Sequence, residues 1–245
     1  ALNELSVAIK KPLRFFNAAQ LELETPRLLN PSTVVFNEVG CHGVAEAAAL
    51  AATGHEGELI VPKEKSDRAT CAIAKSTKIL NPDEIGLRRG KLFIIGTGPG
   101  KQDWLTPEAK DLIDISTDLI GYKLYLDLLG KATSGKTLHK YSLGEEKDRV
   151  IKALNTASEG KTVGLISSGD PGIYAMASLV FDCLKEFDTP SWNRLDILVS
   201  PGISAVQACS AKVGAPLGHD FCAISLSDLL TPWSIIEQRI KAATE

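Results

Sequence analysis

Leu92-Phe93-Ile94-Ile95-Gly96-Thr97-Gly98-Pro99-Gly100 is the stretch that decides the fold of this chain. Four apolar residues followed by a glycine are typical of a buried strand that ends in a tight turn. Further along, Thr106-Pro107-Glu108 predicts a helix start, with threonine as the N-cap and proline at the first helical position. The region therefore predicts a strand, a glycine-rich loop and a helix in succession.

The same succession continues toward the C-terminus. The expected strands are 92–95, 119–121, 162–166 and 195–199, and the expected helices are 106–113, 147–157, 173–187 and 203–213. Strands that alternate with helices imply a parallel sheet with helices on its faces. The fold class predicted for residues 91–245 is therefore α/β.

Residues 1–80 are predicted to form a separate, small α/β domain. The elements expected there are strands at 34–36 and 59–61, a helix at 44–52, and either a strand or a helix at 70–74. Pro62 is expected to close the second strand, and Gly54 to end the helix. The polar segment 75–90 is interpreted as a linker to the second domain at 91–245.

Composition and charge narrow the class of protein. Of the 245 residues, 44% are apolar and 23% are charged, and the formal net charge is −3. These values predict no general binding to nucleic acid or to a membrane surface, and no apolar run reaches the roughly 18 residues of a membrane span. Five cysteines without a CxxC pair argue against a disulfide framework and a structural zinc site. We therefore expect no metal and a reducing, cytoplasmic compartment.

Three loops carry the candidate ligand-binding residues, because each follows a predicted strand and precedes a predicted helix. They span 96–100, 167–174 and 200–205. In open α/β sheets, ligands bind outside the carboxyl ends of the strands, where such loops meet. The first loop is no dinucleotide fingerprint, since Lys101 stands where the third glycine belongs, and no P-loop, since Gln102 replaces the required serine or threonine.

Asp170 is the one acidic residue in these three loops. Its carboxylate suits the hydroxyl or amine groups of a ligand, which donate hydrogen bonds. It also suits the N-cap of the following helix, with Pro171 at the first helical position. The residues alone leave both interpretations open.

Taken together, the three loops resemble the motifs of the tetrapyrrole methyltransferase family, whose members use S-adenosylmethionine. The family pattern GxGPGxxxxLT matches 96–106, the pattern GDP with a following apolar and aromatic residue matches 169–174, and PGISA matches 201–205. The resemblance implies that residues 91–245 form the N-terminal, parallel-sheet lobe of a two-lobed enzyme, truncated before most of the second lobe. The cofactor-binding residues that it implies are Pro99, Ser168, Gly169, Asp170, Ile173, Ser204 and Ala205.

The stretch 218–233 is similar to a signature of the precorrin-3B C(17)-methyltransferase branch of this family. That similarity implies methylation of a precorrin-3B-like corrin precursor at C-17 with ring contraction, in cobalamin biosynthesis. It makes Asp228 and Thr231 the candidate catalytic residues, while His219 and Asp228 also fit a polar strand edge and a helix cap. The resemblance further implies a tetrapyrrole partner and a homodimer when the enzyme is complete.

Residues 30–75 resemble the C-terminal domain of the cobalt-precorrin-5A hydrolase family, through 38–50 and 62–66. Glu46, near a helix start, is a candidate acid or base, or else a surface carboxylate favoured by the helix dipole. Cys41-His42 invites a metal or nucleophile interpretation, which we disfavour because no further ligands are in sight.

Three other functions remain as alternatives. The first is a methyltransferase that acts on another tetrapyrrole, and the second is a non-catalytic corrinoid-binding or scaffold fragment. The third is a nicotinamide-dependent oxidoreductase, which wants an acidic residue after its second strand, where Ile120-Gly121-Tyr122 stands instead. Because the chain opens at Ala1 and 232–240 has no helix stop signal, we expect a fragment or a processed piece.

Overall fold

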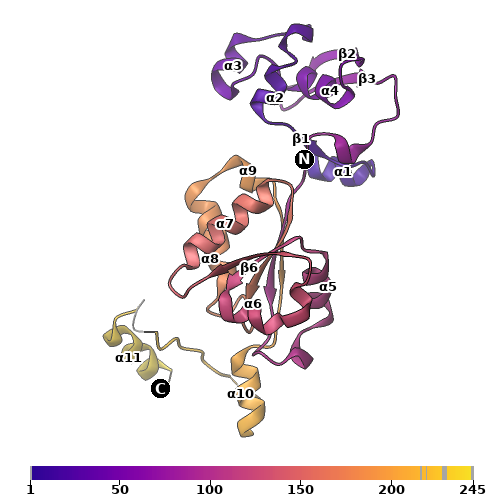
Figure 1. Ribbon diagram of the computed structural model, residues 1–245. Coiled ribbons are helices and arrows are strands. Elements are labelled where there is room, and N and C mark those ends of the chain that lie inside the picture. Colours follow the sequence, from indigo (N-terminus) through magenta and orange to yellow (C-terminus); the bar gives the residue numbers. More distant parts are fainter. Residues whose placement is uncertain (1, 216, 219, 228–230, 244–245) are drawn as a thin grey trace. The chain divides into compact units, whose positions relative to one another are not determined.

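The computed structural model describes residues 2–215, 217–218, 220–227 and 231–243 (Figure 1). The chain divides into two compact units, Ala1–Arg89 and Gly90–Glu245. The elements of the first unit are α1 (Leu2–Ala8), β1 (Arg14–Phe15), α2 (Ala18–Glu22), η1 (Thr25–Arg27), α3 (Thr33–Val39), α4 (Ala45–Thr53), β2 (Glu58–Lys65), β3 (Thr70–Lys75), η2 (Pro82–Glu84) and β4 (Leu87–Arg88).

The second unit holds the longer elements. They are β5 (Lys91–Gly96), η3 (Gln102–Trp104), α5 (Pro107–Ile115), β6 (Asp118–Tyr122), α6 (Lys123–Leu129), η4 (Gly130–Thr133), β7 (Thr137–Tyr141), α7 (Glu146–Ser158), β8 (Thr162–Ser167), α8 (Met176–Phe187), α9 (Pro190–Asn193), β9 (Asp196–Ser200), α10 (Ala205–Val213) and α11 (Trp233–Ala242). Within the described ranges, none of the helices is both long and apolar enough to cross a membrane.

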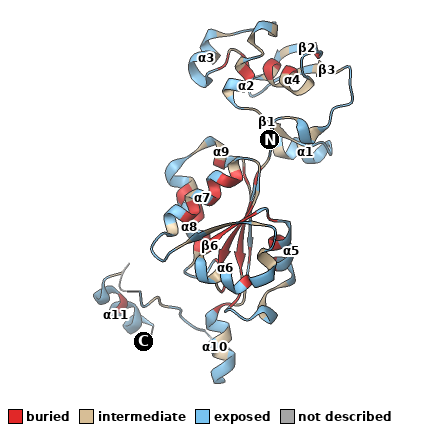
Figure 2. Cartoon of the chain, in the orientation of Figure 1, coloured by how far each residue is buried: buried red, intermediate tan, exposed pale blue. Residues whose placement is uncertain are grey.

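The second unit is built around a parallel sheet. Its five strands, counted over the described chain, lie in the order β7-β6-β8-β5-β9. One face packs against α7, α8 and α9, and the other against α5 and α6. Figure 2 shows the buried residues concentrated in the sheet and on the inner sides of these helices. The α/β class predicted from the sequence is confirmed.

Burial explains why the central strands were easy to predict. Leu92, Ile94, Ile95, Leu165 and Ile166 have no exposed surface at all. Strands covered on both faces are continuous apolar runs, because neither face meets water. Two elements outside the sheet centre, α6 and β7, were missed by the sequence analysis.

Two expected helix starts in the second unit were wrong. The helix expected from residue 173 begins only at Met176, and the one expected from 203 begins at Ala205. Ser204 caps the latter, because its side chain accepts a hydrogen bond from the Gln207 amide and the Gln207 side chain reaches back. The loops before both helices are therefore longer than the sequence suggested.

The first unit overturns one predicted strand. Residues 34–36 lie inside helix α3, despite their β-prone side chains. Ser32 accepts a hydrogen bond from the Val35 amide at the start of this helix, and Gly40 ends it with φ = +78°. These two caps outweigh the weak preference of valine for strands.

The antiparallel pair β2–β3 settles two further expectations. The 59–61 strand is confirmed, but Pro62 does not close it, because β2 continues to Lys65. Residues 70–74, left open between strand and helix, form strand β3. In the 75–90 segment, β4 pairs with β1, so this segment also belongs to the folded unit.

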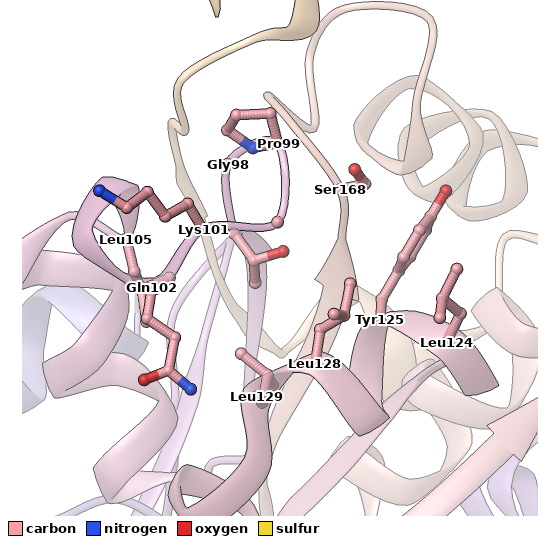
Figure 3. Close-up of a pocket in the computed structure, with 12 residues that line it drawn as sticks. Gly98, Pro99, Lys101, Gln102, Leu105, Leu124, Tyr125, Leu128, Leu129 and Ser168 are labelled. Atoms are coloured by element: carbon pink, nitrogen blue, oxygen red, sulfur yellow. The ribbon is translucent and has the colours of Figure 1, made fainter.

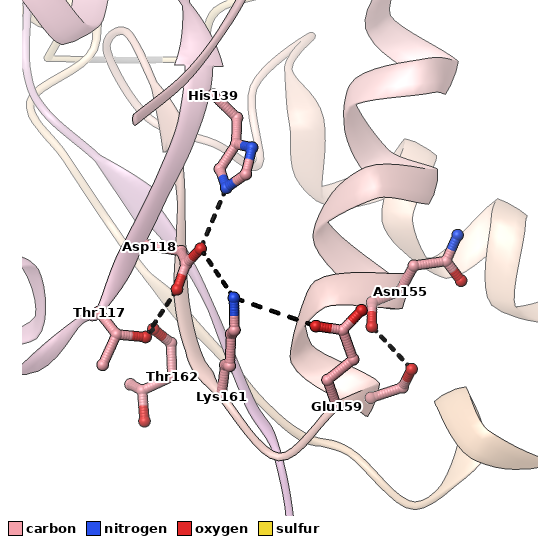
Figure 4. Close-up of polar contacts among 8 residues, drawn as sticks. Thr117, Asp118, His139, Asn155, Glu159, Lys161 and Thr162 are labelled. Carbon is pink, nitrogen blue, oxygen red and sulfur yellow. Dashed lines mark hydrogen bonds and ion pairs between the residues drawn. The ribbon is translucent and has the colours of Figure 1, made fainter. Parts of the chain in front are cut away.

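Asp118 anchors the amino-terminal edge of the parallel sheet (Figure 4). Only 2% exposed, it accepts a hydrogen bond from the Thr117 hydroxyl at 2.8 Å and lies 3.0 Å from Nε2 of His139 and 3.4 Å from Nζ of Lys161. Burial alone would raise the pKa of Asp118, but the contacts with His139, Thr117 and Lys161 prevail and lower it.

Replacing Asp118 by asparagine is expected to cost about 1–3 kcal/mol of unfolding free energy at pH 7, because the partners of this buried carboxylate lose a charged acceptor. A lowered pKa in the folded state stabilises above the unfolded value of about 3.9, and that contribution is lost as the pH falls through the folded pKa. The variant should therefore lose less stability than the parent as the pH falls below the unfolded value and through the folded pKa of Asp118. Urea unfolding followed by tryptophan fluorescence measures this, with the exposed Asp111→Asn as the control. A parallel pH profile for Asp118→Asn and parent would contradict it.

Candidate ligand-binding site

Two glycines join the first two predicted ligand loops. The Gly98 amide donates to the Gly169 carbonyl at 3.2 Å, and the Gly169 amide donates to the Gly98 carbonyl at 2.8 Å. Both glycines have positive φ, +71° and +63°, which other residues adopt only with strain. β5 and β8 pair in parallel, and this antiparallel bridge joins the loops that follow them just past the strand ends.

The third loop packs closely against Gly169 of the second loop and Gly96 at the end of β5. A Cβ atom added to Gly202 would lie 2.1 Å from the Gly169 carbonyl oxygen and 2.8 Å from the Gly96 carbonyl carbon. Both neighbours are backbone atoms and cannot rotate away. The loops after β5, β8 and β9 are therefore held together backbone to backbone, which only glycine permits.

Gly202→Ala should consequently lower the unfolding free energy of the second unit by about 1–3 kcal/mol through overpacking. Gly218→Ala is the matched control, because a Cβ atom there meets nothing within 4 Å. Thermal unfolding followed by tryptophan fluorescence provides the comparison. Equal melting temperatures for the two variants would show that the loops do not pack as closely as described.

Asp170 braces the second and third loops. Its Oδ1 accepts a hydrogen bond from the Gly172 amide at 2.8 Å, and its Oδ2 accepts one from the Gly202 amide at 3.1 Å. Helix α8 begins only at Met176, so Asp170 is not its N-cap and that alternative is wrong. The carboxylate instead fixes the distance between two loops that the sequence separates by some thirty residues.

Tyr174 stands at the end of the second loop with an unusual backbone. Its φ is +50°, a left-handed conformation that is uncommon for a bulky residue. The side chain is 69% exposed, and its hydroxyl donates a hydrogen bond to the Ala223 carbonyl at 2.8 Å. The strained residue thus links the second loop to the segment in which the 218–233 signature begins.

A cavity of about 200 Å³ opens beside the first loop (Figure 3). Its walls come from the loop itself, from the second loop and from α6, and are formed by Thr97, Gly98, Pro99, Gly100, Lys101, Gln102, Leu105, Leu124, Tyr125, Leu128, Leu129 and Ser168. In Figure 3, the Tyr125 ring rises from α6 toward Ser168. Sequence reasoning missed the α6 wall, because a seven-residue helix carries too short a pattern to recognise.

The structure separates the seven residues implied to bind a cofactor into two groups. Pro99 and Ser168 line the cavity, and the other five do not. A Cβ atom added to Gly169 would lie 3.7 Å from both the Cα atom of Ser204 and the amide nitrogen of Ala205. Ile173 is 46% exposed on the second loop. Of the catalytic candidates, Thr231 is half-buried just before α11, and Asp228 lies outside the described residues, as does His219.

Glu46 is buried in the first turn of α4, whereas the helix-dipole interpretation requires it to lie on the surface. It is 2% exposed, and its carboxylate accepts hydrogen bonds from the Leu29, Asn30 and Lys63 amides at 2.9 Å and from Asn30 Nδ2 at 2.7 Å. Burial alone would raise the pKa of Glu46, but these hydrogen bonds prevail and lower it. The surface interpretation is therefore wrong, and the carboxylate serves as a buried connector.

His42 contacts a carboxylate rather than a metal ligand set. Its Nδ1 lies 2.9 Å from Oε1 of Glu22, its amide donates to Oε2 of the same residue, and its ring stacks on Phe36. Cys41, beside it, is buried. Across the part of the chain that is described, no group of three or more histidine, cysteine or acidic side chains is placed to hold a metal ion.

Comparison with known proteins now defines the class. Residues 91–245, more than half of the chain, match the family Tetrapyrrole (Corrin/Porphyrin) Methylases, and the chain belongs to that family. Residues 1–74 match the family Cobalamin synthesis G C-terminus. The resemblances predicted from the loop motifs and from the N-terminal residues are both confirmed.

Particular relatives narrow the class further. The chain is 43% identical over 157 residues to the cobalt-factor III methyltransferase of Priestia megaterium, covering 64% of this chain and 29% of the relative. It is 40% identical over 156 residues to the precorrin-3B C(17)-methyltransferase of a Sinorhizobium species, covering 64% of this chain and 61% of the relative. The crystal structure of the methyltransferase CobJ is 44% identical with a TM-score of 0.59, covering 63% of each chain. The chain thus spans less than two thirds of these proteins.

Proposed function

We propose that this chain is part of an S-adenosylmethionine-dependent C-methyltransferase that methylates a precorrin-3B-like corrin precursor at C-17, with ring contraction, in cobalamin biosynthesis. The observation that carries the proposal is the joining of three motif loops at one sheet edge through Gly98, Gly169, Asp170 and Gly202. The relative at 40% identity is named a precorrin-3B C(17)-methyltransferase, and the relative at 43% identity is named a cobalt-factor III methyltransferase.

The residues at this edge suit S-adenosylmethionine. Glycine loops bring backbone amides and carbonyls close to a ligand, and the half-buried Ser168 adds a hydroxyl group. Ile173 offers an exposed apolar side chain for an adenosine, while Ser204 and Ala205 offer backbone atoms at the start of α10. When bound, the sulfonium supplies an electrophilic methyl group on a sulfur that leaves without acid assistance. The protein's task is then to orient the two reactants and to exclude water.

We further propose the domain assignment that follows from the family. Residues 91–245 would form the N-terminal lobe, and residues 1–80 a part of a hydrolase-like C-terminal domain. The cavity of about 200 Å³ is smaller than the roughly 300–1,000 Å³ of typical ligand sites, which favours a second lobe as the missing wall. A homodimer and a cytoplasmic location complete the proposal.

Calorimetric titration tests the proposed cofactor. S-adenosylhomocysteine should bind to this chain, more weakly than to the full-length Sinorhizobium relative, whereas a nicotinamide dinucleotide should not bind. Transfer of a labelled methyl group by the whole protein to precorrin-3B, and not to uroporphyrinogen, then tests the acceptor. Binding of the dinucleotide instead of S-adenosylhomocysteine would restore the oxidoreductase alternative.

A further inference from the structure

Tyr174 has a backbone conformation that its place in the fold does not call for. Among the described residues other than glycine, Lys10, Tyr174 and Asp188 have positive φ. Asp188 ends helix α8 and Lys10 follows the end of α1, and helix ends commonly adopt the left-handed conformation. Tyr174 instead stands before the start of α8. Backbone strain of this kind persists only where the surrounding structure imposes it, and such places are often functional.

The Tyr174 side chain reaches a distant segment of the chain. Most of its surface is exposed, so burial of the ring does not offset the strain. Its hydroxyl donates to the Ala223 carbonyl at 2.8 Å, across 49 residues of sequence. Among the described residues, this is the one hydrogen bond that joins 220–227 to another part of the chain. The strained conformation therefore places the hydroxyl where it holds this segment.

Residues 220–227 have few other contacts that could hold them in place. The segment lies in neither a helix nor a strand, and Phe221 and Leu226 are 64% and 63% exposed. Ile224 and Ser225 are half-buried. The segment leads along the chain to Thr231, one of the candidate catalytic residues. Its position relative to the motif loops therefore depends on the Tyr174 hydroxyl.

A tight turn connects Tyr174 to the brace at Asp170. The Ile173 amide donates to the Asp170 carbonyl at 3.3 Å, and the Ala177 amide donates to the Pro171 carbonyl at 2.9 Å. The second of these bonds encloses Tyr174, so the tyrosine backbone moves with the loop. A ligand that fixes the second loop would consequently fix the Tyr174 hydroxyl as well.

We infer that Tyr174 is a positioning residue that couples the methyl-donor site to segment 220–227 through its hydroxyl group. This rests on the proposed function, because the second loop is one of those proposed to hold the donor. When the donor orders the loop, the Ala223 carbonyl is held more firmly, and the segment ahead of Thr231 is held with it. Coupling between two sites is reciprocal, so the held segment also strengthens the binding of the donor.

Chymotrypsin cleavage after Phe221 and Leu226, which flank Ala223, measures how firmly the segment is held without any ligand. Cleavage follows the population of the locally opened form when opening and closing are fast. Tyr174→Phe removes the hydroxyl and keeps the ring, so cleavage at both sites should accelerate about two- to tenfold, the range for the loss of one hydrogen bond. Cleavage after Leu143, in the loop between β7 and α7, is the internal reference and should not change.

Tyr174→Gly separates positioning from a role in folding alone. Glycine adopts φ = +50° without strain, so this variant loses the hydroxyl and also relieves the backbone. Its melting temperature should equal or exceed that of the parent, while the segment should be cleaved as fast as in Tyr174→Phe. Tyr141→Phe, which removes a tyrosine hydroxyl on β7, two strands away from β8, is the control and should be cleaved as the parent is. A lower melting temperature in Tyr174→Gly with parental cleavage of the segment would assign Tyr174 to folding alone.

S-adenosylhomocysteine tests the coupling itself. It should slow cleavage after Phe221 in the parent about two- to tenfold and have no effect on this cleavage in Tyr174→Phe. By reciprocity, Tyr174→Phe should weaken the calorimetric affinity for S-adenosylhomocysteine by the same factor.

Parental cleavage of ligand-free Tyr174→Phe, an equal acceleration in Tyr141→Phe, or protection by S-adenosylhomocysteine that survives in Tyr174→Phe would each overturn the coupling. Failure of the parent to bind S-adenosylhomocysteine would instead count against the proposed function, and the coupling would fall with it. The two failures are distinguishable, because the comparison of ligand-free proteins does not depend on the methyl donor.

Discussion

Replacing Asp170 by alanine is expected to weaken the binding of S-adenosylhomocysteine by more than tenfold. The substitution removes the acceptor of two backbone hydrogen bonds, from Gly172 and from Gly202, so the second and third loops lose their brace. A hydrogen bond to a charged group contributes about 1.5–3 kcal/mol, and a tenfold change in affinity corresponds to about 1.4 kcal/mol. Even partial relaxation of the loops would therefore reach this effect.

Two further variants show whether the brace is responsible. Asp170→Asn keeps one acceptor oxygen and loses the other, so its affinity should lie between those of the parent and the alanine variant. Asp182→Ala removes an exposed carboxylate on α8 and should bind as the parent does. Calorimetry gives all four affinities. A folded Asp170→Ala protein with parental affinity would remove Asp170 from the site.

Glu46→Ala is expected to lower the unfolding free energy of the first unit by at least about 3 kcal/mol. The alanine leaves three backbone amides without their acceptor, those of Leu29, Asn30 and Lys63. Each unsatisfied buried donor costs about 1–3 kcal/mol. Because the pKa of Glu46 is lowered in the folded state, its contribution is present above about pH 4.3 and is lost as the pH falls through the folded pKa.

The distribution of tryptophans makes this effect measurable. Trp104, Trp192 and Trp233 all lie in the second unit, so their fluorescence reports on that unit alone. Hydrogen exchange of segment 29–63 should accelerate in Glu46→Ala while tryptophan-detected unfolding stays unchanged. The exposed Glu58→Ala is the control. Parental exchange rates in Glu46→Ala would mean that the carboxylate does not hold α4, β2 and the preceding loop together.

The parts of the fold that the sequence predicts are those decided by local burial. Residues 92–95 and 162–166 are apolar almost throughout because both faces of the sheet are covered, and a short run of that kind between turn residues is typical of a buried strand. Edge strand β7 was missed because its residues 137–141 are only partly covered and alternate with polar side chains. Helix α6 follows β6 without an intervening loop, so no turn signal separates the two.

In the candidate site too, local sequence patterns do not predict contacts between distant residues. The motif loops mark the sheet edge correctly, but the sequence cannot show that Asp170 is satisfied by Gly202, more than thirty residues away. Glu46 likewise has the sequence of a first-turn surface residue, and only the tertiary structure brings three amides to its carboxylate. Contacts between distant residues, rather than local propensities, decide the role of both acidic side chains.

The proposed function depends above all on the three joined loops holding the methyl donor. Hydrogen exchange of the whole chain, followed by mass spectrometry with and without millimolar S-adenosylhomocysteine, examines these loops without any substitution. We expect slower exchange concentrated in residues 96–100, 168–174 and 202–206 when the ligand is present. Protection elsewhere in the second unit, with these loops exchanging at the same rate in both samples, would contradict the proposal.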